Sequence, residues 1–128
     1  MDRGNQPQPA VSGLQFAQEA ARLADDNRAE DVVILDLRGL SSVADFFVIA
    51  TGTSDRQMRA IIDLIEQRAE HLGQSRFGLA GYDTATWLLA DYVDVVIHLF
   101  SRERRHYYEL DVLWGDAPRI AWEKASAR

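Results

Sequence analysis

Apolar residues recur at helical spacing near the start of the chain. Phe16 and Ala20 lie four positions apart, and a leucine and further alanines continue the same stripe, as on one face of an α-helix. Ser12 and Gln15 have the spacing of a capping box, in which the serine side chain accepts a hydrogen bond from the first helical turn. The pattern therefore predicts a first helix over residues 13–27.

A second apolar stripe follows in the middle of the chain. Ser54 and Gln57 repeat the capping spacing, and Gly73 is the residue type that favours the left-handed backbone just after a helix end. The helix predicted between them is therefore bounded on both sides. Its apolar stripe consists of Met58, Ile61, Ile62, Ile65, Ala69 and Leu72.

Two stretches rich in β-branched and aromatic residues predict buried strands. Residues 32–37, with the sequence VVILDL, are apolar almost without interruption, which is typical of a strand covered on both faces. Residues 45–51 repeat this composition and end at Gly52. We expect both strands in the interior of a sheet.

Three shorter apolar runs complete the predicted sheet. Residues 77–80 form a short strand, and the segments TWLLAD and DVVIHLF form a pair of strands joined by a turn at residues 91–93. Ser101 then begins a third helix, which carries Tyr107 and Leu110 along one side. This order of elements predicts an α/β fold with a mixed five-stranded sheet packed with helices.

The chain of 128 residues has the length of one ordinary domain. It contains no internal repeat and no linker that would divide it. We expect one domain over residues 12–117, a flexible N-terminal tail over residues 1–11 and a C-terminal tail over residues 118–128. The apolar residues in IAWEKA suggest a short helix within the C-terminal tail.

The composition narrows the class of partner. The 20 acidic and 14 basic residues give a net charge of −6, which repels nucleic-acid phosphates and attracts basic protein surfaces.

The absence of cysteine excludes disulfides, thiol nucleophiles and cysteine zinc sites. No apolar run approaches the length of a membrane span, and the N-terminus carries no signal or transit pattern. We therefore expect a cytoplasmic protein without membrane contact.

The segment TGTSDR joins the second predicted strand to the second helix, where free backbone N–H groups and the helix dipole favour an anion. A phosphate is one candidate for this position. The segment lacks the lysine of a P-loop and the spacing of a dinucleotide fingerprint, however. Capping of the helix by Ser54 is therefore the favoured interpretation.

A strand, a Gly-Thr-Ser turn and later aspartates are features of the nucleotidyltransferase fold, whose chemistry needs carboxylates that converge on a divalent metal. Asp91 and Asp94 would be the carboxylates, with magnesium as the metal. They lie three positions apart across a predicted turn, whereas carboxylates on one strand face lie two positions apart. The residue two positions after Asp94 is Val96, which is not a carboxylate. We interpret both aspartates as residues that cap or solvate the turn, and keep the enzyme as the alternative.

None of the three histidines is placed for catalysis. His98 shares a strand face with Asp94 and Val96, where a histidine is more often a hydrogen-bonded structural group than a base. His71 and His106 fall on separate helices without metal-ligand spacing. We assign no catalytic residue, no cofactor and no metal site.

The predicted strand TWLLAD presents different residues on its two faces. Trp87, Leu89 and Asp91 share one face, and Leu88 and Ala90 share the other. Trp87 is therefore either a core residue or an anchor that inserts into a partner protein. The alternation alone does not choose between these two interpretations.

A basic run begins the third predicted helix, where Arg102, Arg104 and Arg105 precede Tyr107 and Tyr108. Such a run can contact RNA through charge and stacking. In an acidic chain, a solvated helix face with buried tyrosines is the favoured interpretation. We therefore expect little direct contact with RNA.

Three long segments together resemble the Iojap family of ribosomal silencing factors: VVILDLRGLSSVADFFVIATGTSDRQ, WLLADYVDVVIHLF and SRERRHYYELDVLWGDA. The resemblance covers residues 32–117. The chain departs from the family pattern at Gln57, Ala80 and Val93, where the family commonly has His, Glu and Gly. The positions that agree in order and spacing include Asp36, Asp45, Gly52, Thr53, Ser54, Arg56, Trp87, Asp91, Asp94, His98, Tyr107, Tyr108 and Trp114.

This resemblance implies a nucleotidyltransferase-like fold without enzymatic activity. It also implies binding to large-subunit ribosomal protein fourteen (uL-fourteen) on the face where the ribosomal subunits join, steric exclusion of the small subunit, and reduced translation when nutrients are scarce. Carried onto this chain, it makes Trp87 the anchor, with Leu89, Asp91 and Tyr108 beside it. A homodimer that packs Trp87 against its own copy is a further interpretation and is compatible with the first.

Overall fold

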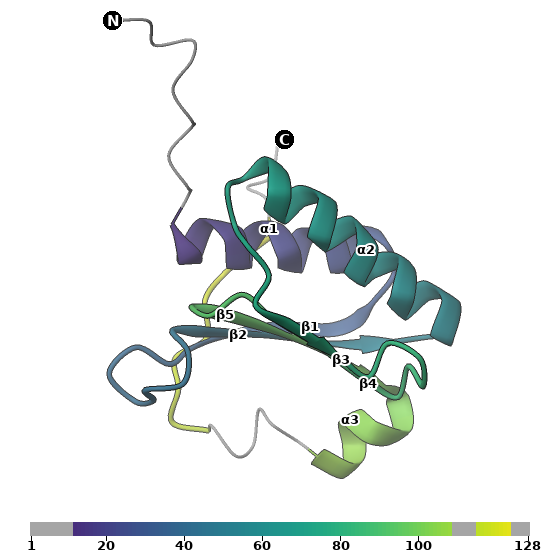
Figure 1. The fold of residues 1–128 in the computed structure, drawn as a ribbon. Coiled ribbons are helices and arrows are strands. Elements are labelled where there is room, and N and C mark those ends of the chain that lie inside the picture. Colours follow the sequence, from purple (N-terminus) through teal and green to yellow (C-terminus); the bar gives the residue numbers. More distant parts are fainter. Residues whose placement is uncertain (1–11, 109–114, 124–128) are drawn as a thin grey trace, which may run out of the picture.

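The computed structural model of the chain describes residues 12–108 and 115–123, apart from the side chains of residues 106–108. Two long helices lie over one face of a sheet, and a short helix lies on the opposite side (Figure 1). None of the helices in these ranges is long and apolar enough to cross a membrane. In chain order the elements are α1 (Gly13–Asp26), β1 (Glu30–Asp36), β2 (Phe46–Gly52), α2 (Asp55–His71), β3 (Gly78–Ala80), β4 (Trp87–Asp91), β5 (Val95–Ser101) and α3 (Arg102–Tyr108).

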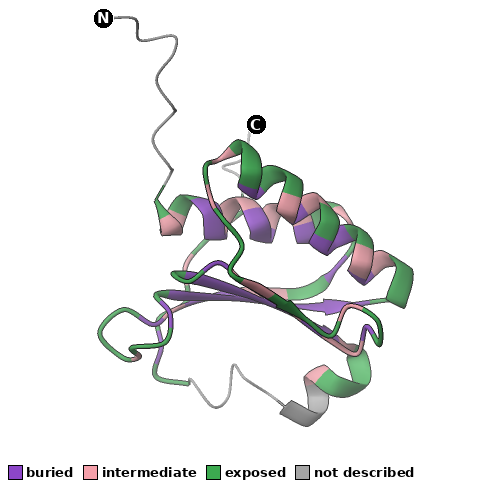
Figure 2. Ribbon diagram, viewed as in Figure 1, coloured by how far each residue is buried: buried purple, intermediate pink, exposed green. Residues whose placement is uncertain are grey.

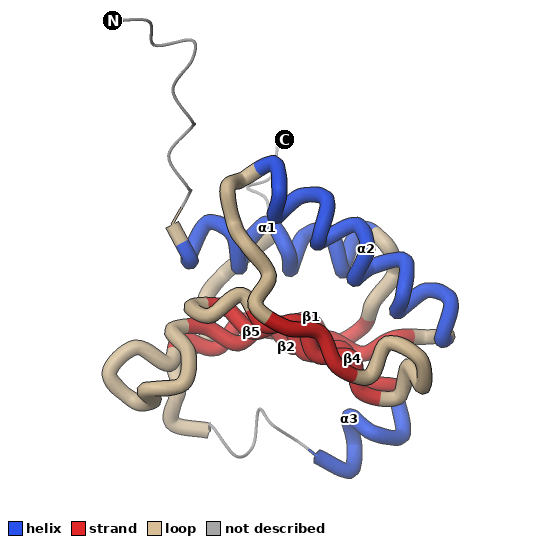
Figure 3. Tube along the Cα trace, in the orientation of Figure 1, coloured by secondary structure: helices blue, strands red, loops and turns tan. Residues whose placement is uncertain are grey.

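The five strands form one mixed sheet in the order β1-β2-β5-β4-β3. β2 and β5 run parallel in the centre, and the other neighbouring strands are antiparallel. Figure 3 shows the resulting layers, with α1 and α2 above the sheet and α3 below it. The prediction of a single domain with a mixed five-stranded sheet packed with helices is confirmed. The nucleotidyltransferase-like assignment stays a prediction.

The local signals at both long helices act as predicted. Ser12 Oγ accepts a hydrogen bond from Gln15 N at 3.1 Å, and Ser54 Oγ accepts one from Gln57 N at 3.1 Å. Gly73 follows α2 with a φ of +75°, in the left-handed region that glycine adopts without a Cβ penalty. The start of each helix is therefore fixed by the residue immediately before it.

The principal core lies between the sheet and the helices α1 and α2. Val95, Ile97 and Leu99 alternate along β5, point toward the helices and are fully buried. Phe16 and a row of alanines allow α1 to pack on β1 and β2. Each large side chain buried here contributes roughly 1.5–3 kcal/mol by leaving water. Figure 2 shows the result, a sheet buried along most of its length beneath helices with exposed outer faces.

β1 lies at the edge of the sheet, which corrects the expectation that it is an interior strand. Its outer side is occupied by the chain beyond residue 117: Asp36 N donates to Pro118 O at 2.8 Å, and Ile120 N donates to Ile34 O at 3.0 Å. Ile34 and Leu35 are buried on opposite faces of the strand, as the apolar composition predicted. Composition indicates burial of the two faces, but it does not indicate what pairs with each edge.

Residues 118–123, which the sequence analysis assigned to a tail, pack on the domain. Trp122 Nε1 donates to Val32 O at 3.2 Å, and Arg22 Nε donates to Trp122 O at 2.8 Å. Ile120 and Trp122 are half-buried against the principal core. The described part of IAWEKA is not helical, because its backbone and side chains bond to β1 and α1 instead. Residues 1–11, the expected N-terminal tail, lie outside the described residues.

Candidate partner-binding site

β4 presents Trp87, Leu89 and Asp91 on the sheet face opposite α1 and α2. Leu88 and Ala90 point toward the helices and are fully buried in the principal core. Trp87 and Leu89 are half-buried and pack against a second apolar cluster on the other face. The predicted alternation is confirmed, and the tryptophan belongs to the face that the two long helices leave uncovered.

The second apolar cluster supports one side of the Trp87 indole. The indole stacks on Phe100, with ring centroids 5.0 Å apart and ring planes at 29°. The two residues are direct partners in the register between β4 and β5. Trp87 is therefore packed on one side without being enclosed. The buried members of the cluster are Leu35, Leu37, Ala44, Phe47, Ile49, Val96, Phe100 and Ala117.

His98 lies beneath the same tryptophan. Its side chain is 4% exposed, and Trp87 Nε1 donates a hydrogen bond to His98 Nδ1 at 3.1 Å. Phe47 meets the imidazole edge-on, with ring centroids 4.6 Å apart. Burial lowers the pKa of His98 to about 4, because a charged ring would lose its hydration. The imidazole is therefore neutral at pH 7 and is the hydrogen-bonded structural group that the sequence predicted.

Asp91 caps the turn between β4 and β5. Its Oδ1 accepts a hydrogen bond from Val93 N at 2.7 Å, and Val93 itself has a φ of +74°. Asp94 is exposed, and its backbone carbonyl accepts a hydrogen bond from Asp45 N at 2.8 Å. The capping interpretation is confirmed for Asp91. Within the part of the chain that the structure describes, no three histidine or carboxylate side chains gather as metal ligands.

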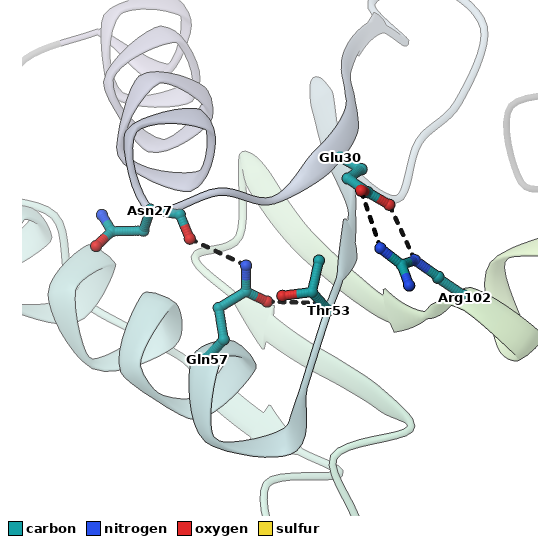
Figure 4. Close-up of polar contacts among 5 residues, drawn as sticks. All are labelled: Asn27, Glu30, Thr53, Gln57 and Arg102. Carbon is teal, nitrogen blue, oxygen red and sulfur yellow. Dashed lines mark hydrogen bonds and ion pairs between the residues drawn. The ribbon is translucent and has the colours of Figure 1, made fainter.

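The junction between β2 and α2 is closed by its own side chains (Figure 4). Gln57 Oε1 accepts a hydrogen bond from Thr53 N at 2.7 Å, and Gln57 Nε2 donates to Asn27 O at 3.0 Å. Gln57 Oε1 occupies the backbone N–H of Thr53, and the Ser54 cap occupies that of Gln57. Two of the backbone N–H groups that a phosphate would need are therefore already bonded. A cavity of about 280 Å³ beside the junction is lined in part by Asp55 and Glu103, which disfavour an anion. The capping interpretation is confirmed.

Two arginines of the basic run in α3 bond within the protein. Arg102 donates two hydrogen bonds of 3.0 Å to Glu30 (Figure 4), and these bonds hold the pKa of Glu30 below its usual value. Arg105 Nη1 donates to Thr51 Oγ1 at 3.0 Å. Both contacts favour the interpretation of this run as a structural helix face and disfavour its interpretation as an RNA-binding site. The predicted contact of Tyr108 falls on a side chain outside the described residues and stays a prediction.

Sequence reasoning missed the pairing of Trp87 with His98, although a signal for it was present. The short turn between β4 and β5 sets the register so that Leu89 lies opposite His98 and Trp87 opposite Phe100. Residues diagonal to each other on one face of two antiparallel strands are within reach of aromatic side chains. The length of the turn therefore predicts which side chains share this face.

Comparison with known proteins identifies the family. A family model described as "Ribosomal silencing factor during starvation" matches residues 11–128. The Bacillus subtilis (strain 168) protein named "Ribosomal silencing factor RsfS" is 48% identical over 99 residues, which cover 77% of this chain and 84% of that protein. The Arabidopsis thaliana "Protein Iojap, chloroplastic" is 38% identical over 113 residues, which cover 86% of this chain and 46% of that protein.

A solved structure agrees with this result. The crystal structure of a Chromobacterium violaceum protein matches this fold with a TM-score of 0.78 at 26% identity, covering 92% of this chain and 98% of that one. The family model spans nearly the whole chain, and the similarity to the Bacillus subtilis protein extends over most of both proteins. This chain therefore belongs to the family of ribosomal silencing factors.

Proposed function

We propose that this chain binds the large ribosomal subunit through large-subunit ribosomal protein fourteen (uL-fourteen) and thereby blocks association with the small subunit. The block is steric and requires no chemistry from the chain. Its effect is to repress translation when nutrients are limiting. The protein acts in the cytoplasm, and the residues that contact the partner are Trp87, Leu89, Asp91 and Tyr108.

One observation carries the proposal: in a ribosomal silencing factor, Trp87 stands half-buried on the sheet face that α1 and α2 leave uncovered. A tryptophan that is already packed on one side loses little side-chain freedom on docking. Large aromatic side chains also supply much of the binding free energy at protein interfaces. Leu89 extends the apolar contact along the strand, and Asp91 ends it with a carboxylate.

The charge of the chain supports a basic protein partner. A net charge of −6 attracts basic surfaces and repels phosphates, so direct RNA contacts are expected to be few. Asp45 and Asp94 are exposed where β2 and β5 begin, at the end of the sheet where β4 ends with Asp91. The acidic field therefore extends to the end of β4.

Cosedimentation with purified large subunits tests the proposed interface. Trp87→Ala should weaken binding by roughly 2–4 kcal/mol, the cost of truncating an interface hot spot. The matched control is Leu40→Ala, because Leu40 is 49% exposed and lies in the loop between β1 and β2, and β5 separates these strands from β4 in the order of the sheet. The control should bind like the parent. Retention of a folded Trp87→Ala variant at the parent's level would remove Trp87 from the interface.

A homodimer through Trp87 would bury the same surface and would compete with the subunit. It stays a prediction. Sedimentation over a range of protein concentrations tests it, and a dimer that forms equally well in the Trp87→Ala variant would exclude this tryptophan from the contact.

A further inference from the structure

Trp87 and His98 form a hydrogen-bonded pair across two strands. Leu89 lies directly opposite His98, so the Trp87 indole reaches the imidazole along the diagonal of the antiparallel pair. Trp87 Nε1 donates to His98 Nδ1 at 3.1 Å, while the indole ring stacks on Phe100. The hydrogen bond and the stacking together determine both the position and the rotation of the indole.

The imidazole that accepts this bond is itself held in place. Phe47 meets it edge-on at 4.6 Å between centroids, and Phe100 lies nearly parallel to it at 6.1 Å with an interplanar angle of 5°. Because Nδ1 accepts the indole proton, the proton of the neutral ring resides on Nε2. His98 is thus a fixed acceptor whose orientation is set before any partner arrives.

Packing alone does not explain a histidine at this position. His98 Nε2 is buried and has no hydrogen-bond partner among the described residues, which leaves a polar group desolvated without compensation. Native structures avoid such groups, and each one calls for an explanation. Phenylalanine or leucine would fill a similar space among Phe47, Ile49 and Phe100 without this cost. What distinguishes histidine is its acceptor nitrogen, which meets the Trp87 indole.

We propose that His98 is a positioning residue that holds the Trp87 indole in the orientation in which it meets the partner protein. This inference rests on the proposed function, because it takes Trp87 to be the anchor. An indole fixed in advance avoids the entropic cost of immobilising it during docking. His98 itself is buried and does not touch the partner.

The test measures binding to large subunits for His98 variants with and without the acceptor. His98→Phe and His98→Leu remove the acceptor and keep an apolar side chain, and binding should weaken about fivefold, as the loss of one neutral hydrogen bond predicts. His98→Asn places Oδ1 the same number of bonds from Cβ as Nδ1 and should restore parental binding. In the Trp87→Ala background, His98→Phe should cause no further loss, because the group that it positions is gone.

A second measurement uses the parent protein and does not depend on the variants folding. In a ¹H–¹⁵N spectrum, the Trp87 indole N–H of the parent should exchange with solvent more slowly than that of an exposed indole. Exchange of the parent's Trp87 N–H at the rate of a free indole would overturn the proposal.

The outcomes separate this inference from the proposed function. If Trp87→Ala binds like the parent, the proposed interface fails. If Trp87→Ala weakens binding but folded His98→Phe and His98→Leu do not, the interface stands and the positioning role is overturned. If His98→Asn binds as weakly as His98→Phe, the acceptor is not what matters, and the positioning role is again overturned.

Discussion

Lowering the pH should destabilise the folded protein through His98. The histidine of the unfolded chain takes up a proton near pH 6.5, whereas burial lowers the pKa of His98 in the folded protein to about 4. Between these values the unfolded state binds more protons, so the free energy of unfolding rises with pH. The stability that the neutral His98 contributes to the free energy of unfolding is therefore complete above pH 6.5. It falls as the pH is lowered and is lost near pH 4.

The size of the effect follows from the two pKa values. Their difference corresponds to about 3 kcal/mol, most of which falls between pH 7.5 and pH 4.5. Urea unfolding followed by circular dichroism at both pH values measures this quantity. The side chain is 4% exposed, so solvent screening reduces the effect little.

The matched variant is His98→Asn, which keeps an acceptor for Trp87 but does not titrate. Carboxylates such as Glu30 and Asp36, whose pKa values are lowered by hydrogen bonds from arginines, affect both proteins alike. The parent should therefore lose roughly 2–3 kcal/mol more than His98→Asn between pH 7.5 and pH 4.5. Equal losses in the two proteins would contradict this prediction, because they would mean that His98 is as well solvated in the folded state as in the unfolded chain.

Four further substitutions test the packing and the backbone by thermal or urea unfolding. Gly52→Ala would place a Cβ 2.0 Å from Met58 Cγ and should destabilise the fold by about 1–3 kcal/mol, whereas Gly78→Ala, with no atom within 4 Å, should have little effect. Trp122→Ala removes a half-buried ring and its bond to the backbone of β1, and should cost about 2 kcal/mol; no loss would show that residues 118–123 do not stabilise the domain. Val93→Gly should raise stability by about 0.5–1 kcal/mol, because Val93 has a φ of +74° and glycine adopts that backbone without strain; a fall in stability would contradict this.

The helices and the central strands could be predicted because their signals are local. Ser12 and Ser54 bond to backbone amides three positions along the chain, so the sequence contains both partners of each cap. The alternation of Trp87 and Leu88 follows from strand geometry alone. The Gly73 backbone also follows from its position just after a helix.

The remaining features depend on contacts between distant positions. The edge position of β1 and the packing of Trp122 both depend on a segment about 90 residues further along the chain. Alternation separates Trp87 from Leu88, but only the placement of α1 and α2 decides which of them is covered. The role of His98 as an acceptor required the register of β4 and β5, which the length of the turn between them sets but local composition does not specify.

We propose that this protein, bound to the large subunit, stands where the small subunit must land. Light scattering during the mixing of purified subunits, with the parent protein in excess, tests that claim most directly. We expect that the parent lowers the rate and the extent of subunit joining, that Leu40→Ala does the same, and that Trp87→Ala loses most of the effect. Joining at an unchanged rate in the presence of excess parent protein would contradict it.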